Sequence, residues 1–335
     1  MKLTKIASMV MTSATVLSTV AAATPAIIQA QTQEGNAKMN GGKALPDTNH
    51  SKVGITFAKG SGSNPGGGNN PDNPGGGNNP GGGGDNPDNP GGGNNPGGDD
   101  HKHHDDDGIG YLRLQRVPEV LDFGTHTTFN SANPVFTAAG TNVNGIVDGT
   151  NNDVYPGYAG GANQTPKLST TLSYLSAING KTWVTVVDKQ ETRHDTDAKN
   201  DSHAGNWQLS VKANGPLTTG SSSSAKTISG ATLGFNNTVL GETQNITGLT
   251  GNPDDGNYNY VAHLVDNLNK SFTVNLAANG TAVQVGSSSV AATGSGAAVF
   301  AWDPSDIKLT LPASASVDAG TYTTSLTWTL STGIQ

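Results

Sequence analysis

The sequence predicts an all-β fold: an antiparallel β-sandwich-type domain that follows a signal peptide and a long disordered linker. Two observations predict the domain. From residue 111 onward, short runs with apolar residues at every second position recur, and turn-forming Gly, Asn and Pro separate them. A third observation predicts the linker, because only 33% of the 335 residues are hydrophobic and 46 are Gly, too little for packed core throughout.

Residues 1–30 have the pattern of a secretory signal peptide. Lys2 and Lys5 form a basic start, an apolar stretch follows, and Ile-Gln-Ala at residues 28–30 provides a small-residue cleavage end. The apolar stretch is short for a membrane-spanning helix, although an uncleaved anchor is the alternative. We therefore expect a secreted protein. Since the chain contains no cysteine, its stability must come from a core rather than from disulfides.

Residues 31–110 are expected to form the linker. Residues 31–60 are polar and show no obvious periodicity, and residues 61–98 consist almost only of Asn, Pro, Gly and Asp. Such a segment buries too little apolar surface to offset the entropy of ordering, so we expect disorder. Its end carries three histidines amid five aspartates, and these are weak metal-ligand candidates: His101, His103 and His104. Because a metal site needs rigidly held ligands, a solvated charged joint is the preferred interpretation, and no metal or cofactor is predicted.

Residues 111–335 are expected to form the β domain. Two polar stretches, residues 142–166 and 189–205, are too long for tight hairpins and are interpreted as functional loops or flexible excursions. Residues 263–269 alone hint at a helical turn. The strands are predicted at residues 168–174, 183–187, 206–213, 231–235, 271–276, 282–285, 298–302, 307–311 and 322–331.

The last of these strands has the clearest pattern. Tyr322, Leu326, Trp328 and Leu330 fall on one face, whereas Thr and Ser fill the other, which predicts one buried and one solvated side. The same Trp-x-Leu spacing occurs earlier in residues 207–209. All four tryptophans of the chain lie in strand-like runs, so core packing is the preferred interpretation for them, with sugar stacking as the alternative.

Two Trp-x-Leu elements in this order resemble the WxL surface proteins of Gram-positive bacteria. The resemblance covers residues 111–335 and includes Leu-Asp-Phe-Gly-Thr at 121–125, Trp-Asp-Pro at 302–304 and Leu-Thr-Leu-Pro-Ala at 309–313. The Pro that often follows the final motif is missing. The resemblance implies a C-terminal domain that binds the cell wall by non-covalent attachment to peptidoglycan. It also implies co-operation with membrane-anchored WxL-interacting proteins and, in some members, adhesion to host extracellular matrix.

Under this resemblance, four motif residues carry attachment, either directly or by holding the domain together: Trp207, Leu209, Trp328 and Leu330. Their inward alternation favours the second role. Residues 45–49 are similar to a wall-sorting signal, but no apolar segment and basic tail follow, so we expect non-covalent retention at the cell surface. Four tyrosines in polar loops are candidates for exposed glycan or partner contacts: Tyr155, Tyr158, Tyr258 and Tyr260.

Charge limits how such binding works. Residues 111–335 contain 11 Lys and Arg against 16 Asp and Glu, a net charge of −5 with His neutral. Long-range electrostatic repulsion would therefore oppose binding to anionic phosphate-bearing polymers, and no basic footprint for nucleic acid is present. We expect recognition of the wall by short-range hydrogen bonds and stacking, with weak salt dependence.

The sequence does not predict an enzyme. It contains no nucleophile elbow, phosphate-binding Gly loop, zinc-protease helix or Cys cluster. The acidic run in residues 188–203 could hold calcium or supply a glycosidase carboxylate pair, but a solvated excursion is preferred. Beside the wall-binding interpretation, an adhesin or assembly subunit that binds a host-matrix or surface protein without glycan contact is the main alternative.

Overall fold

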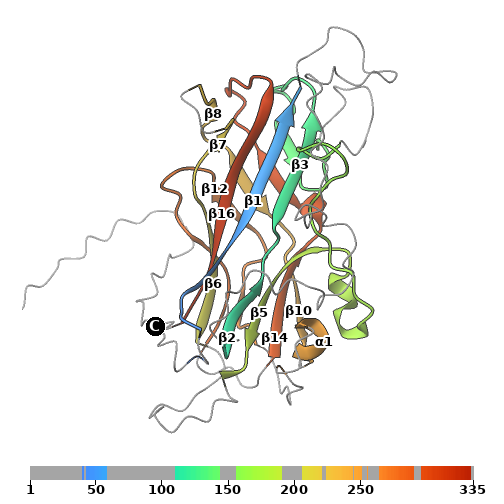
Figure 1. Ribbon diagram of the computed structural model, residues 1–335, viewed down its shortest axis with the longest axis vertical. Coiled ribbons are helices and arrows are strands. Elements are labelled where there is room, and N and C mark those ends of the chain that lie inside the picture. The colour runs from blue at the N-terminus through green and yellow to red at the C-terminus, as the bar shows by residue number, and fades with distance from the viewer. Residues whose placement is uncertain are drawn as a thin grey trace, which may run out of the picture.

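The computed structural model describes residues 40, 43–58, 110–143, 156–190, 206–220, 224–243, 245–250, 255, 264–289 and 296–332. These residues form three sheets with little helix, so the all-β prediction is confirmed. The molecule is elongated, and its long axis follows the longest strands (Figure 1). The signal peptide and the predicted metal-ligand histidines lie outside the described residues, as does most of the linker.

The main sheet has the strand order β11-β13-β6-β16-β1-β3, and β7 and β8 extend it beside β16. Among its described strands all pairings are antiparallel except that β1 runs parallel to β3. The bounds are β11 Asn267–Leu268, β13 Val283–Ser288, β6 Trp207–Ala213, β16 Gly320–Thr332, β1 Asp47–Phe57, β3 Val120–His126, β7 Leu217–Thr218 and β8 Thr227–Ile228.

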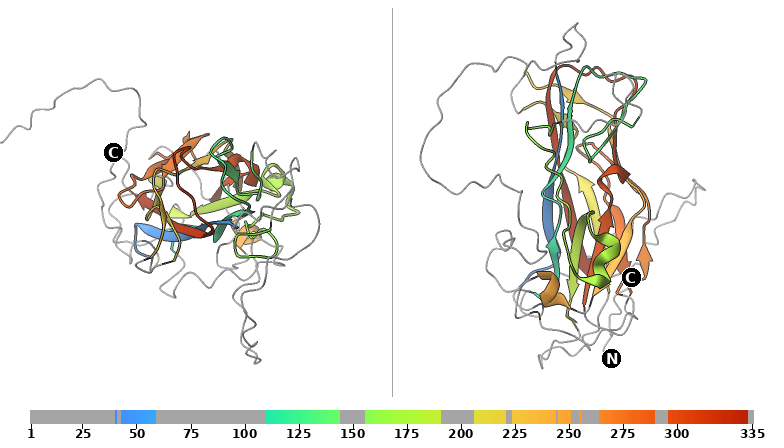
Figure 2. Two further views of the ribbon diagram at one scale, coloured as in Figure 1. Left: turned by 90° about the horizontal axis from the view of Figure 1, so that it is seen from above. Right: turned by 90° about the vertical axis from the view of Figure 1, so that its right-hand side faces the viewer.

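Two four-stranded sheets lie behind the main sheet in Figure 1, and Figure 2 shows them on the opposite side of the molecule. The second sheet consists of β10 Val239–Thr243, β14 Gly296–Trp302, β5 Thr182–Asp188 and β2 Leu112–Arg116. The third consists of β12 Phe272–Asn275, β9 Thr232–Phe235, β15 Ile307–Thr310 and β4 Val135–Thr137. Short helical segments are η4 Ser173–Ile178, α1 Ile246–Thr250 and η7 Pro304–Asp306.

One hydrophobic core joins all three sheets, and a smaller one lies on the other face of the second sheet. η4 and α1 cover the smaller core with Leu175, Ile178, Ile246 and Leu249. The central strands β5 and β14 are consequently buried at every position. Their near-continuous apolar sequences follow from this burial on both faces.

Most predicted strands are confirmed, including those that became β5, β6, β9, β12, β13, β14, β15 and β16. The strand predicted at residues 168–174 is wrong, because η4 begins at Ser173 and buries Leu175 and Ile178 on one helical face. The helical turn predicted at residues 263–269 is also wrong over its described part, since β11 lies there and pairs with β13. In both places tertiary packing overrides a weak local pattern.

The largest correction concerns the start of the domain. β1 lies inside the stretch predicted as linker, yet it is a central strand of the main sheet, between β16 and β3. Val53, Ile55 and Phe57 are buried in the core and alternate with outward-facing residues, a period-two signal that the polar flanks obscured. The domain therefore includes β1 and does not begin at residue 111.

Candidate functional site

The two Trp-x-Leu motifs lie side by side on neighbouring strands of the main sheet. In the antiparallel register of β6 and β16, Leu209 is opposite Leu330, and Trp328 is opposite Val211. All of these side chains point into the core and are fully buried. The order of the motifs in the sequence thus corresponds to one continuous apolar surface across two paired strands.

Trp328 forms the centre of this surface. Its indole Nε1 donates a 2.8 Å hydrogen bond to Ser51 Oγ on β1, and the Ser51 hydroxyl in turn donates to the carbonyl of Pro118. A buried indole N–H without an acceptor would be costly, so Ser51 makes this position compatible with tryptophan. The final motif is therefore tied both to its own sheet neighbours and to the β2–β3 connection.

An aromatic cluster joins Trp328 to the other two sheets. Its ring centroid lies 6.1 Å from that of Trp302 on β14 and 5.8 Å from that of Phe235 on β9. Phe235 stacks on Phe272 of β12 at 4.9 Å and meets Trp302 edge-on at 5.1 Å. Trp302 Nε1 donates to Thr238 Oγ1 at 2.9 Å. Such pairs each contribute about 0.5–1.5 kcal/mol beyond burial, so the cluster is a main junction between the sheets.

The first motif tryptophan, Trp207, is held in a similar way at the other end of the core. Its Nε1 donates a 3.1 Å hydrogen bond to Asp188 Oδ2, and its ring meets Phe300 edge-on at 6.4 Å. Gly286, opposite Leu209, leaves room for Phe300, because a Cβ there would lie 2.5 Å from the ring. Asp188 was predicted to begin an acidic surface loop, but it is buried and serves as the indole acceptor.

The fourth tryptophan, Trp183, packs in the smaller core and is 5% exposed. The Arg116 guanidinium carbon lies 4.3 Å from the centroid of its ring. Burial lowers the pKa of Arg116, although the charge of Glu119 partly opposes this. All four indoles therefore lie inside the domain, in agreement with the core-packing interpretation and against direct stacking on sugars.

Tyr158 does not form the exposed contact predicted for it. It is 6% exposed, and its ring lies over Gly54 of β1, where a Cβ would come within 2.5 Å of the ring. Lys52 Nζ lies 5.4 Å from the centroid of the ring, and the Tyr158 carbonyl accepts a hydrogen bond from Thr56. The other three candidate tyrosines, Tyr155, Tyr258 and Tyr260, lie outside the described residues.

Asp122 of the Asp-Phe-Gly element fixes the segment that carries Tyr158. The carboxylate is fully buried and accepts backbone N–H groups from Gly124, Tyr158 and Gln164 at 2.8–2.9 Å. Gly124 has φ +84°, a conformation that strongly favours glycine. The described end of the stretch 142–166 is therefore anchored to β3, which contradicts the prediction of a flexible excursion for this part of the stretch.

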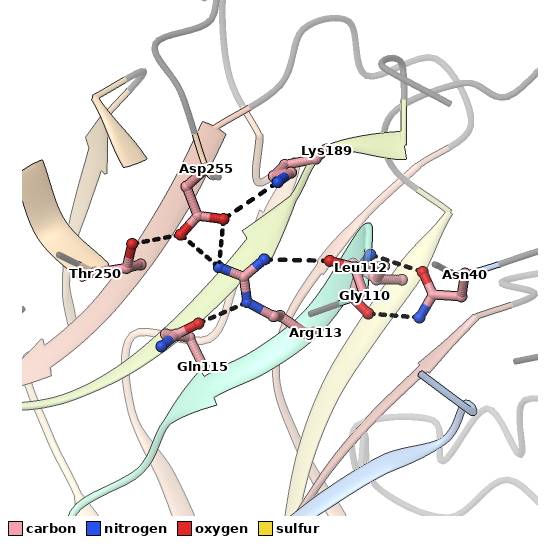
Figure 3. Close-up of polar contacts among 8 residues, drawn as sticks. All are labelled: Asn40, Gly110, Leu112, Arg113, Gln115, Lys189, Thr250 and Asp255. Carbon is pink, nitrogen blue, oxygen red and sulfur yellow. Dashed lines mark hydrogen bonds and ion pairs between the residues drawn. The ribbon is translucent and has the colours of Figure 1, made fainter. Parts of the chain in front are cut away.

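A buried ion cluster, which the sequence did not reveal, lies beside β2 and β5 (Figure 3). Asp255 is fully buried, and both of its oxygens accept 2.8 Å bonds from Arg113 Nη2. Lys189 Nζ lies 3.2 Å from Oδ1, and the Thr250 hydroxyl donates to Oδ2. Although burial raises the pKa of Asp255, the Arg113 charge, hydrogen bonds from Thr250 and Arg113, and Lys189 lower it overall.

The free edge of β2 beside this cluster is capped by one side chain. The amide of Asn40 accepts a hydrogen bond from Leu112 N and donates one to Leu112 O, both at 2.8 Å, as a paired strand would (Figure 3). Asp47 accepts from Leu114 N on the same edge and forms an ion pair with Lys43. These contacts satisfy an edge that is otherwise open to pairing with another chain.

Among the described residues, no group of three or more His, Asp or Glu side chains is placed to hold a metal ion. Within the same ranges no helix has the length and apolar character needed to cross a membrane. The acidic residues of the predicted loop beyond Gln190, up to His203, lie outside the description.

The protein is therefore an all-β domain in which two Trp-x-Leu motifs, on adjacent strands, form the centre of the core. The model of the WxL family, described as a surface cell wall-binding domain, matches residues 44–333. The chain therefore belongs to the WxL family and carries a cell wall-binding domain. The match begins just before β1, in agreement with the position of that strand. Neither a curated protein nor a solved structure gave a significant match.

Proposed function

We propose that this protein is secreted and attaches non-covalently to the peptidoglycan of a Gram-positive cell wall, without catalytic activity. The observation that carries the proposal is the match to a wall-binding family across nearly the whole folded chain. No covalent link is required for this kind of retention. The domain then acts as an anchor for the rest of the chain.

In this proposal the Trp-x-Leu motifs act by holding the domain together. Each motif indole is fully buried, and each indole N–H is bonded to a protein acceptor. A side chain with no exposed surface and no unpaired donor has nothing to offer a wall ligand. Attachment therefore depends on the motifs through folding, and the contacts with the wall come from other residues.

The proposal includes partners beyond the wall. In line with the family resemblance, the domain works in surface complexes with membrane-anchored WxL-interacting proteins, and adhesion to host matrix is a further role. The alternative is an adhesin or assembly subunit that binds a surface or host-matrix protein with no glycan contact. One experiment separates the alternatives.

The test is co-sedimentation of the full chain from residue 31 with peptidoglycan from which proteins and phosphate-bearing polymers have been stripped. The proposal predicts that the protein sediments with this material and that no reducing sugar is released during incubation. Protein that stays in the supernatant, yet sediments with envelopes that keep their proteins, would support the adhesin alternative instead. Release of reducing sugar would contradict the absence of catalysis.

A further inference from the structure

The main sheet has an outward side, opposite the apolar side that carries the Trp and Leu residues of the two motifs. Because side chains alternate along a strand, the middle residue of each Trp-x-Leu motif must point away from the core. These residues are Gln208 and Thr329, and in the register of β6 and β16 each lies next to another outward polar residue, Ser331 and Ser210 respectively. The motifs that fix the core therefore also fix a polar row on the opposite face.

This polar surface extends over three adjacent strands, β6, β16 and β1, and forms the side that faces the viewer in Figure 1. No other labelled helix or strand crosses the middle of it in that view, although the Tyr158 ring covers Gly54 on the β1 part of this side. We call it the outer polar face, and its partly or fully exposed residues are Ser210, Lys212, Thr321, Thr323, Ser325, Thr327, Thr329, Ser331, Thr48, His50, Lys52 and Thr56.

The charge of this face differs from that of the chain. The whole chain has a net charge of −8. By contrast, Lys52, Lys212 and His50 are exposed on the face, whereas no Asp or Glu points outward from β1, β6 or β16, each described along its whole length. The face thus combines sparse basic groups with many hydroxyls, which is complementary to a polymer rich in hydroxyl and amide groups with scattered carboxylates.

The hydroxyl groups are arranged as a fixed array. Thr327 Oγ1 donates to Asn214 Oδ1 at 2.8 Å and contacts His50 Nδ1 at 3.1 Å, so it connects β16 with β1 and with the residue that follows β6. Strands lie about 4.8 Å apart and outward side chains recur about every 6.8 Å along each, so the array is regular in two directions. β-branched Thr side chains on a paired sheet lose little further freedom on binding, which favours contact with an extended polymer.

We propose that the outer polar face is the surface that contacts peptidoglycan. Its hydroxyl and amide groups hydrogen-bond to sugar hydroxyl and acetamido groups, and Lys52 and Lys212 pair with stem-peptide carboxylates. A phosphate-rich polymer fits less well, since the net negative charge of the chain would repel its dense charge. This inference rests on the proposed function and adds the location and chemistry of the contact.

The test compares two double variants of the full chain from residue 31 in co-sedimentation with stripped peptidoglycan. K52E/K212E places two acidic groups on the face and should weaken binding about tenfold, since two attractions are replaced by two repulsions. The matched control K167E/K270E makes the same change in charge at exposed lysines outside the face and should bind like the wild type. Thermal unfolding of each variant verifies that the fold is kept.

A second variant tests the hydrogen bonds without changing charge. T327V/T329V keeps the shape and β-branching of both side chains while it removes their hydroxyls, and binding should fall several-fold. If the wild type sediments and both face variants sediment equally well, the face is not the contact surface, although the proposed function stands. If the wild type does not sediment with stripped peptidoglycan, the proposed function fails, and this inference fails with it.

Discussion

The two faces of β16 differ in what they contribute. On the inner face Tyr322, Leu326, Trp328 and Leu330 are all 1% exposed or less, and on the outer face every Thr and Ser keeps contact with solvent. The inner face joins three sheets through aromatic contacts, whereas the outer face forms a regular array of hydroxyls. In our proposal, β16 therefore stabilises the fold with one set of residues and contacts the wall with the other.

The largest effect is expected from the inner face. Trp328→Ala removes the indole that contacts Trp302 and Phe235, and it leaves Ser51 without its donor. The free energy of unfolding should fall by about 3–5 kcal/mol, measured by denaturant titration. Wall binding should be lost in proportion to the unfolded fraction. An unchanged unfolding midpoint together with lost sedimentation would mean that the indole contacts the wall directly, and would contradict a purely structural role for the inner face.

A comparable loss is expected at the buried ion cluster. Asp255→Asn leaves Arg113 and Lys189 without the carboxylate that accepts from both, and a broken buried ion pair costs about 3–5 kcal/mol. The control is Asp318→Asn, which breaks an ion pair with Lys226 in which both side chains are 55% exposed. That change should cost much less in the same titration, because water screens an exposed ion pair. Equal losses would mean that burial does not decide the contribution.

Acid should weaken the same cluster. Because the pKa of Asp255 is lower in the folded chain than in the unfolded chain, its carboxylate stabilises the fold fully above about pH 4. This contribution is lost as the pH falls through the lowered, folded-state pKa. The stability of the wild type should therefore fall more steeply below pH 4 than that of Asp255→Asn, as measured by unfolding at a series of pH values. Parallel curves would exclude Asp255 as a source of the acid dependence.

A smaller effect is expected from the acceptor of the Trp328 indole. Ser51→Ala removes the hydroxyl and leaves the buried Nε1–H unpaired, which costs about 1–3 kcal/mol. Thr48→Ala, on the exposed face of the same strand, is the control and should change stability by about 0.5 kcal/mol or less. The denaturant midpoints of the two variants measure this difference, and equal midpoints would contradict a role for the Ser51 hydroxyl in stability.

The sequence was sufficient where a strand shows its own alternation. In β16 and β6 the apolar residues recur at every second position, so both the strand and its buried side could be predicted. β1 was missed because its buried residues, Val53, Ile55 and Phe57, sit in a polar segment beside a long Gly-rich tract. What makes it a central strand is pairing with β16 and β3, which no local pattern records.

The polar sites were less predictable than the strands. Arg113 and Asp255 are 142 positions apart, and Lys189 and Asp255 are 66 apart, so only the fold brings them together. Asp188 appeared to begin a surface acidic run, but its position at the end of β5 buries it, and it accepts a hydrogen bond from the Trp207 indole of another sheet. The burial of Tyr158 likewise depends on Gly54, a residue in a strand that the sequence did not reveal.

Acrylamide quenching of tryptophan fluorescence shows whether the motif indoles stay in the core when the wall is bound, because all four indoles are 5% exposed or less. We expect blue-shifted emission with weak quenching in the free protein, and the same quenching when soluble peptidoglycan fragments saturate it. Strong quenching in the free protein that peptidoglycan relieves would show that an indole lies at the contact with the wall, and would contradict the assignment of the motif tryptophans to the core.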